Sequence, residues 1–165
     1  MDPGRIVRHV LQTRRALRRA FTPATLDAIE LAVHEGEQAH SGEIRFVIEA
    51  ELDWPRLLRG QSPRDRAIEV FAALGVWDTE SNGGVLIYVL MADHAVEIVA
   101  DRGIGPRVPA AGWAAICERM RQRYAAGRFL DGSIEGIAAV NALLTEYLPA
   151  SGPRGSGLPD RPEIL

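Results

Sequence analysis

Residues 75–103 read GVWDTESNGGVLIYVLMADHAVEIVADRG, and this stretch decides the fold. Residues 85–91 are apolar throughout, which is typical of a central strand covered on both faces. The short ADHA connection has the length of a hairpin turn, and VEIVA predicts the returning strand. We expect residues 84–91 and 95–100 to pair antiparallel and to bury both faces of the first strand: Val85, Ile87 and Val89 on one, Leu86, Tyr88 and Leu90 on the other.

A further strand is predicted upstream, where residues 43–52 read EIRFVIEAEL. Apolar and charged side chains alternate along most of it, which indicates one buried face and one face in water. Ile44, Phe46 and Ile48 belong to the buried face, whereas Arg45 and Glu49 are expected in solvent.

Helical patterns surround these strands. Thr22 and Pro23 predict a helix start, as an N-cap hydroxyl followed by proline at the first helical position. Ser62 and Asp65 predict a second start with the spacing of a capping box. Two more helices are expected at about 109–124 and 131–147. Strands interspersed with this many helices predict the α/β class, as a three-layer α/β/α sandwich whose small mixed sheet contains a central antiparallel strand pair.

Composition divides the chain into three parts. Residues 1–21 predict a basic amphipathic helix, since six arginines and one acid occur among the first nineteen residues. Residues 22–148 carry the α/β domain. Residues 149–165 are rich in proline and glycine, which predicts an extended or mobile tail, although residues 158–165 have a composition able to dock on the domain.

The basic N-terminal segment admits two interpretations. In the first, the segment lies on anionic lipid or on a nucleic-acid backbone. In the second, it packs Ile6, Val10 and Leu17 against the domain while its arginines face water. We prefer the packed helix, because the apolar stripe is short and carries no aromatic residue before Phe21. Membrane contact through residues 5–19 remains the alternative. No nucleic-acid partner is expected, and a protein partner stays open.

Length and composition limit the remaining possibilities. A chain of 165 residues with 47% apolar and 25% charged residues predicts one globular domain. No apolar run approaches the roughly 18 residues that span a bilayer, and no apolar segment of a secretory signal follows the basic N-terminus. We therefore expect a cytoplasmic location. The single cysteine, Cys117, is expected to pack as a small hydrophobic residue.

The loop WDTESNGG before the central strand carries the candidate chemistry. Asp78, Glu80 and Asn82 occupy alternate positions, and hard cations such as Ca²⁺ require about six to eight oxygen ligands. A complete site would need Asp101, which follows the returning strand, or Glu43, which begins the upstream strand, together with water molecules. The alternative is ordinary turn chemistry, with polar side chains bonding loop backbone groups and Gly83 and Gly84 providing conformational freedom.

Arg102 also has two interpretations. In the structural interpretation, Arg102 forms an ion pair with Asp101 or belongs to a turn that ends the strand. In the functional interpretation, it recognises an anionic group while Asp101 and Asp78 bind a cation, as a phosphoester substrate would require. No Cys-x5-Arg signature, Asp-x-Asp motif or glycine-rich phosphate loop occurs in the chain. The expected cofactor is Ca²⁺ or Mg²⁺, with no organic cofactor.

The ordered features from about Leu26 to Leu148 resemble the TPM domain, the fold shared by chloroplast thylakoid lumen proteins and many bacterial envelope proteins. They are a tryptophan at a helix exit, an acidic loop, Asn-Gly, GVLIYVL, a short turn with Asp, VEIVADRGI, and GRFLDGSIEGI after a helix. Within that family the chain is most similar to a compact bacterial subgroup without signal peptide or membrane helix.

The resemblance implies a small mixed sheet between helices and an acidic groove at one end of the strands. It further implies divalent-cation binding, often calcium, as in some members, and a phosphatase activity proposed for others. The groove acids map onto Asp78, Glu80, Asn82 and the exit of the second strand. At the exit of the second strand this chain departs from the family pattern, because Val99 and Gly105 stand where many members carry glutamate. The first hypothesis is therefore a domain that binds a cation, a small polar ligand or a partner in this cleft. The alternative is a cation-dependent phosphohydrolase.

Overall fold

The computed structural model describes residues 3–11, 14–150 and 157–165. The helices are α1 (Pro3–Leu11), α2 (Arg14–Ala20), α3 (Pro23–Gly36), α4 (Trp54–Leu58), α5 (Pro63–Ala73), α6 (Ala110–Ala125) and α7 (Phe129–Tyr147), with short 3-10 turns η1 (Glu37–Ala39) and η2 (Gly105–Arg107). The strands are β1 (Glu43–Glu49), β2 (Gly84–Leu90), β3 (Ala95–Ala100) and β4 (Glu163–Ile164).

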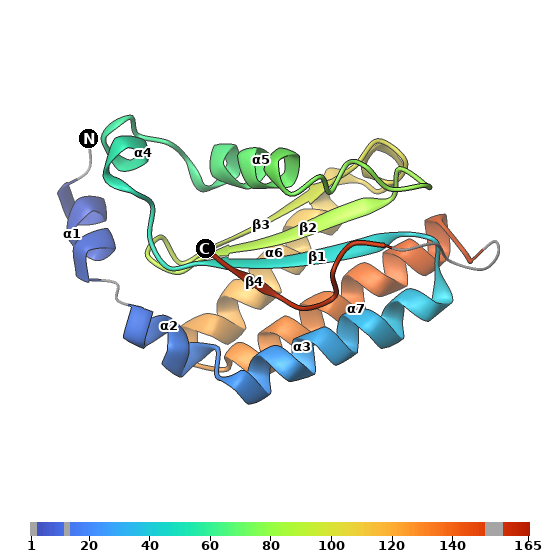
Figure 1. The fold of residues 1–165 in the computed structure, drawn as a ribbon, viewed down its shortest axis with the longest axis horizontal. Coiled ribbons are helices and arrows are strands. Elements are labelled where there is room, and N and C mark those ends of the chain that lie inside the picture. The colour runs from blue at the N-terminus through green and yellow to red at the C-terminus, as the bar shows by residue number, and fades with distance from the viewer. Residues whose placement is uncertain (1–2, 12–13, 151–156) are drawn as a thin grey trace.

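The four strands form one mixed sheet in the order β3-β2-β1-β4 (Figure 1). β2 and β3 pair antiparallel, with Val85 opposite Ala100 and Leu90 opposite Ala95, which confirms the predicted hairpin. β1 pairs parallel with β2 on one side and with β4 on the other. The parallel strands therefore begin at the same end of the sheet, where the predicted loop site lies.

Helices cover both faces of this sheet. Figure 1 shows α5 along one face and α3, α6 and α7 along the other. Val85, Ile87 and Val89 belong to the larger apolar cluster, which includes Ile29 of α3 and Ile137 of α7. Leu86, Tyr88 and Leu90 belong to a second cluster with Ala67 and Val70 of α5. The predicted three-layer α/β/α sandwich, with both faces of the central strand buried, is thus confirmed.

The predicted helix starts also form. The Thr22 hydroxyl accepts a hydrogen bond from the amide of Thr25, and Ser62 Oγ accepts one from the amide of Asp65. One short helix, α4, was not predicted, although Asp53 caps it by accepting from the Arg56 amide and Pro55 lies in its first turn. At the sheet edge, Arg64 of α5 donates to the carbonyl of Ile98 in β3 at 2.5 Å.

The prediction of a solvent-facing side on β1 is wrong, because Arg45 and Glu49 are both buried. Glu49 accepts two hydrogen bonds from Arg66 of α5, at 2.9 and 3.0 Å, and one from the Tyr88 hydroxyl at 2.6 Å. Burial first, and then the charge of Glu49, raise the pKa of Tyr88 well above its ordinary value. Charged residues on this face are buried because oppositely charged and polar partners meet them there.

The C-terminal residues dock on the same face of the domain. Arg45 donates to the carbonyls of Pro159 and Arg161, at 2.8 and 2.7 Å, and pairs with Glu163. The predicted ability of residues 158–165 to dock is therefore confirmed, whereas residues 151–156 of the predicted tail lie outside the described residues.

The N-terminal segment is helical, as α1 and α2, with residues 12–13 of the predicted single helix outside the described range. Leu17 packs in the core as expected. The prediction that Val10 packs inward is wrong, since 59% of Val10 is exposed. Among the described helices, none combines the length and the apolar character needed to cross a bilayer.

Candidate functional site

Two loops meet at one end of the sheet, as the hairpin register requires. The loop of residues 78–84 enters β2, and the loop of residues 101–105 leaves β3. The amide of Asp101 donates to the carbonyl of Gly84 at 2.9 Å, and the amide of Gly103 donates to the carbonyl of Asn82 at 2.8 Å. The predicted meeting of these loops is confirmed, and we call it the loop junction.

Glycine residues at the loop junction allow other segments of the same chain to approach closely. A Cβ on Gly103 would lie 2.5 Å from the carbonyl oxygen of Asn82 and 2.7 Å from that of Ser81. A Cβ on Gly84 would lie 1.8 Å from the carbonyl oxygen of Val76. The space beside these glycines is therefore filled by the protein's own backbone and leaves no opening there for a ligand.

Asp101 is the buried charged group of the loop junction, with 9% of its surface exposed. Its Oδ1 accepts a hydrogen bond from the amide of Arg102 at 2.7 Å. Its Oδ2 is fully buried and has no hydrogen-bond partner within the described part of the chain. A carboxylate oxygen in this situation is costly, because a buried acceptor loses its hydration without replacement.

Arg102 does not pair with Asp101. Its Nε and Nη2 donate to the side-chain oxygen of Asn82, at 2.9 and 2.6 Å. Asn82, which accepts both of these hydrogen bonds, has a left-handed backbone conformation with φ of 50°. The ion-pair interpretation is wrong, whereas the strand-ending turn forms, since Gly105 donates to the Asp101 carbonyl at 2.7 Å. The guanidinium lies at the exposed rim.

The other predicted site residues are dispersed. Asp78 and Glu80 are exposed on the loop. Glu43 accepts from the amide of Leu158 at 2.5 Å, so it holds the C-terminal segment instead of facing the loop junction. Within residues 3–11, 14–150 and 157–165, no three His, Cys, Asp or Glu side chains gather as a metal-binding group. Asp78, Glu80 and Asp101 thus do not meet as three carboxylates, and cation binding stays a prediction.

Turn chemistry explains the remaining polar residues of the loop. Thr79 Oγ1 accepts from the amide of Gly83 at 3.1 Å, and Ser81 Oγ donates to the carbonyl of Ser41 at 2.7 Å. Of the two alternatives raised by the sequence, turn chemistry therefore holds for Thr79 and Ser81, which stabilise the loop. The cation site stays a prediction.

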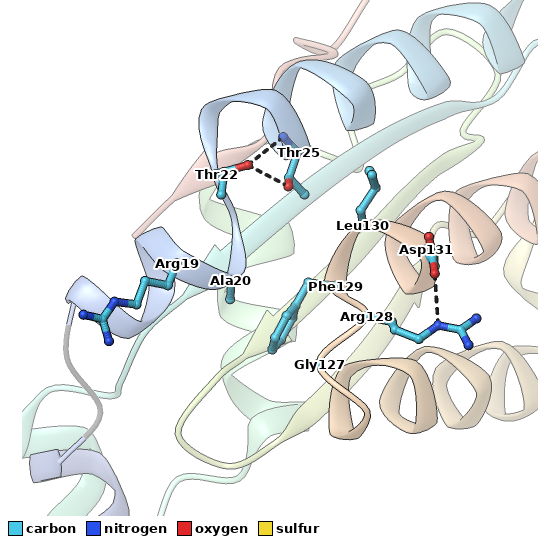
Figure 2. Close-up of a pocket in the computed structure, with 9 residues that line it drawn as sticks. All are labelled: Arg19, Ala20, Thr22, Thr25, Gly127, Arg128, Phe129, Leu130 and Asp131. Atoms are coloured by element: carbon cyan, nitrogen blue, oxygen red, sulfur yellow. Dashed lines mark hydrogen bonds and ion pairs between the residues drawn. The ribbon is translucent and has the colours of Figure 1, made fainter.

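A cavity of about 210 Å³ lies elsewhere, between the start of α3 and the turn from α6 to α7. Arg19 and Arg128 line it together with Thr22 and Thr25. Figure 2 shows the two guanidinium groups pointing to opposite sides, with Arg128 paired to Asp131 at 3.0 Å. The cavity therefore lacks the convergent charges of an anion site.

Sequence reasoning missed a polar anchor at the opposite end of the hairpin. Asp93, in the turn between β2 and β3, is paired with Arg5 of α1 at 2.6 Å, and His9 Nε2 lies 3.2 Å from its Oδ1 without the alignment of a good hydrogen bond. His9 Nδ1 accepts from the amide of Leu52 at 3.0 Å. No local pattern could reveal this anchor, because its residues lie more than 40 positions apart in the sequence.

Comparison with known proteins agrees with this architecture. The family model of the TPM domain matches residues 17–143. The chain is similar to the BA42 protein from the psychrophilic bacterium Bizionia argentinensis, at 29% identity over 87% of this chain and 94% of that chain, with a TM-score of 0.72. It also shares its fold with the N-terminal domain of a protein from P. gingivalis, at 19% identity, coverage of 77% and 78%, and a TM-score of 0.60. No curated protein matches the chain.

Proposed function

The chain belongs to the TPM domain family, and from this premise we propose that its loop junction binds a divalent cation, Ca²⁺ or Mg²⁺. The observation that carries the proposal is Oδ2 of Asp101, which is buried and has no partner among the described residues. Hard cations bind carboxylate and carbonyl oxygens, so a cation would supply the missing interaction.

The available oxygens support a weak site. The carbonyls of Ser81 and Asn82 lie against Gly103, two residues after Asp101 in the chain, and the same loop carries the exposed carboxylates Asp78 and Glu80. Water would have to provide the remaining ligands. Arg102 opposes a cation by its charge. We therefore expect a dissociation constant on the order of 10⁻⁴ to 10⁻³ M, as in cation sites with few protein ligands.

Thermal unfolding tests the proposal. With a dissociation constant of about 10⁻³ M, about 10 mM Ca²⁺ should stabilise the protein by roughly 1.4 kcal/mol, which corresponds to several degrees in Tm. Asp101→Asn should abolish this rise and leave the metal-free Tm unchanged or higher, since it removes a buried unpaired charge. Glu35→Gln, at an exposed carboxylate of α3, is the control and should retain the rise.

A Tm that neither Ca²⁺ nor Mg²⁺ changes would refute cation binding. So would an equal rise in the Asp101→Asn variant, because the stabilising ion would then bind elsewhere.

Arg102 favours a second candidate, a cation-dependent phosphohydrolase. The guanidinium is exposed beside Asp101, it pairs with no carboxylate in the described part of the chain, and the family model carries phosphatase in its name. Arginine suits a phosphate group because its donors match two phosphate oxygens. Hydrolysis of p-nitrophenyl phosphate that requires Mg²⁺ or Ca²⁺ and falls in both Arg102→Gln and Asp101→Asn would support this activity. Hydrolysis unaffected by both variants would exclude this site.

A further inference from the structure

Helix α1 is attached to the domain by its polar side. Arg5 donates to Asp93 through Nε and Nη2, and its Nη2 also donates to the carbonyl of Gln61 at 2.7 Å. His9, one helical turn later, is buried and accepts from the amide of Leu52. Positions 5 and 9 lie on the same side of a helix, so this side faces the domain.

The opposite side of α1 is apolar and open. Val7 is 54% exposed and Val10 is 59% exposed. An amphipathic helix on a globular domain ordinarily buries its apolar stripe and leaves its charges in water. In helix α1, Arg5 and His9 face the domain, while the described residues provide no cover for Val7 and Val10.

More exposed apolar side chains lie close to α1. The helix binds both flanks of α4, through Leu52 before it and Gln61 after it. Trp54 and Leu58 of α4 are 56% and 53% exposed. Figure 1 shows α1, α2 and α4 gathered at the same end of the molecule.

The same end of the molecule carries exposed arginines. Arg15, Arg18 and Arg19 of α2 and Arg59 after α4 are exposed, and none of them forms an ion pair within the described ranges. Arg8 keeps 46% of its side chain exposed, although its Nη2 lies 3.9 Å from Asp93. This end of the molecule is therefore cationic, in a chain whose formal net charge is -3.

We infer that α1, α2 and α4 form a docking surface for an anionic lipid membrane. Apolar side chains with a tryptophan among flanking arginines match the interface of an anionic bilayer, where acyl chains lie just beneath phosphate groups. A second copy of the chain fits the surface poorly, because a two-fold contact would bring the same arginines together. The surface is distinct from the loop junction, and the inference does not depend on cation binding.

Vesicle co-sedimentation tests the inference on the full chain. The protein should sediment with vesicles made of equal parts of phosphatidylglycerol and phosphatidylcholine, but not with phosphatidylcholine alone, and high salt should release it. The double variant Val7→Ser and Val10→Ser should lower the partition coefficient about tenfold, since its apolar contact is lost. Arg18→Gln with Arg19→Gln should lower it as well.

Leu31→Ser with Ile68→Ser is the matched control, because both residues are exposed apolar residues on α3 and α5. This control should bind anionic vesicles as the unchanged protein does. The melting temperature of every variant should stay within a few degrees of that of the unchanged protein. The inference is overturned if the protein does not bind anionic vesicles at low salt, or if the Val7→Ser and Val10→Ser variant binds them equally well. It is also overturned if sedimentation velocity shows a dimer that the same variant abolishes, since the surface would then join two copies.

Discussion

Glu49 is a buried carboxylate whose charge is met by Arg66 from α5 and by the hydroxyl of Tyr88 from the neighbouring strand. Removing one partner of such a group costs far more than the intact pair contributes, because the remaining charge is left without water. Exposed ion pairs behave differently, since water solvates each member when the other is removed.

Arg66→Ala is therefore expected to lower the free energy of unfolding by about 3–5 kcal/mol, measured by urea denaturation. Arg121→Ala, which breaks an exposed pair with Glu118 on α6, should lower the free energy of unfolding far less. Replacing both Glu49 and Arg66 by leucine should recover much of the loss. Equal costs at the two arginines would contradict the burial argument.

At the scale of elements, α1 is held by the anchor around Asp93. Burial alone would raise the pKa of Asp93, but the hydrogen bonds and the charge of Arg5 lower it below its ordinary value, with a smaller contribution from the neighbouring His9. A carboxyl whose pKa is lowered in the folded protein stabilises the fold above its unfolded pKa of about 3.9. That contribution is lost as the pH falls through the lower, folded value.

Asp93→Asn should accordingly loosen α1, because Arg5 and His9 lose the charge that faces them. We expect amide hydrogens of α1 to exchange about tenfold faster or more at neutral pH, as measured by hydrogen–deuterium exchange, with little change in β2. Asp27→Asn, which removes an exposed partner of Arg161, is the control. In the unchanged protein, the protection factors of the α1 amides, which correct for the pH dependence of intrinsic exchange, should fall below about pH 4. Protection of α1 that survives the Asp93 substitution would show that other contacts hold the helix.

Elements were predictable where their signals are local. The hairpin, the caps at Thr22 and Ser62, and the buried faces of β2 all follow from residues close together in sequence. The burial of the polar face of β1 could not be predicted in this way, because the alternation of residues along one strand cannot show that Arg66 and Glu163 cover that face. The same limit applies to the candidate site. Antiparallel pairing predicted that Asp101 meets the preceding loop, but not that Asn82 would bind Arg102 or that Glu43 would hold Leu158.

At the scale of the whole molecule, the C-terminal segment is part of the domain. It supplies β4, a carboxylate for Arg45 and the amide that Glu43 binds. Ending the chain after residue 150 should therefore lower the free energy of unfolding by roughly 2 kcal/mol or more, because these contacts and the packing of Leu158 are lost. Thermal denaturation measures the change. An unchanged Tm would show that residues 157–165 contribute nothing to stability.

The strand order also affects how the protein can aggregate. VLIYVL, in β2, combines high β-propensity with no charge and no proline, which is the composition of segments that stack into amyloid. In the native sheet it has β1 on one side and β3 on the other, so no free edge of it can recruit another chain. The outer strands are poorer templates, since β4 has two residues and Arg64 occupies a carbonyl of β3. Fibril growth would therefore have to begin from unfolded chains, and any ligand that stabilises the folded domain should also delay it.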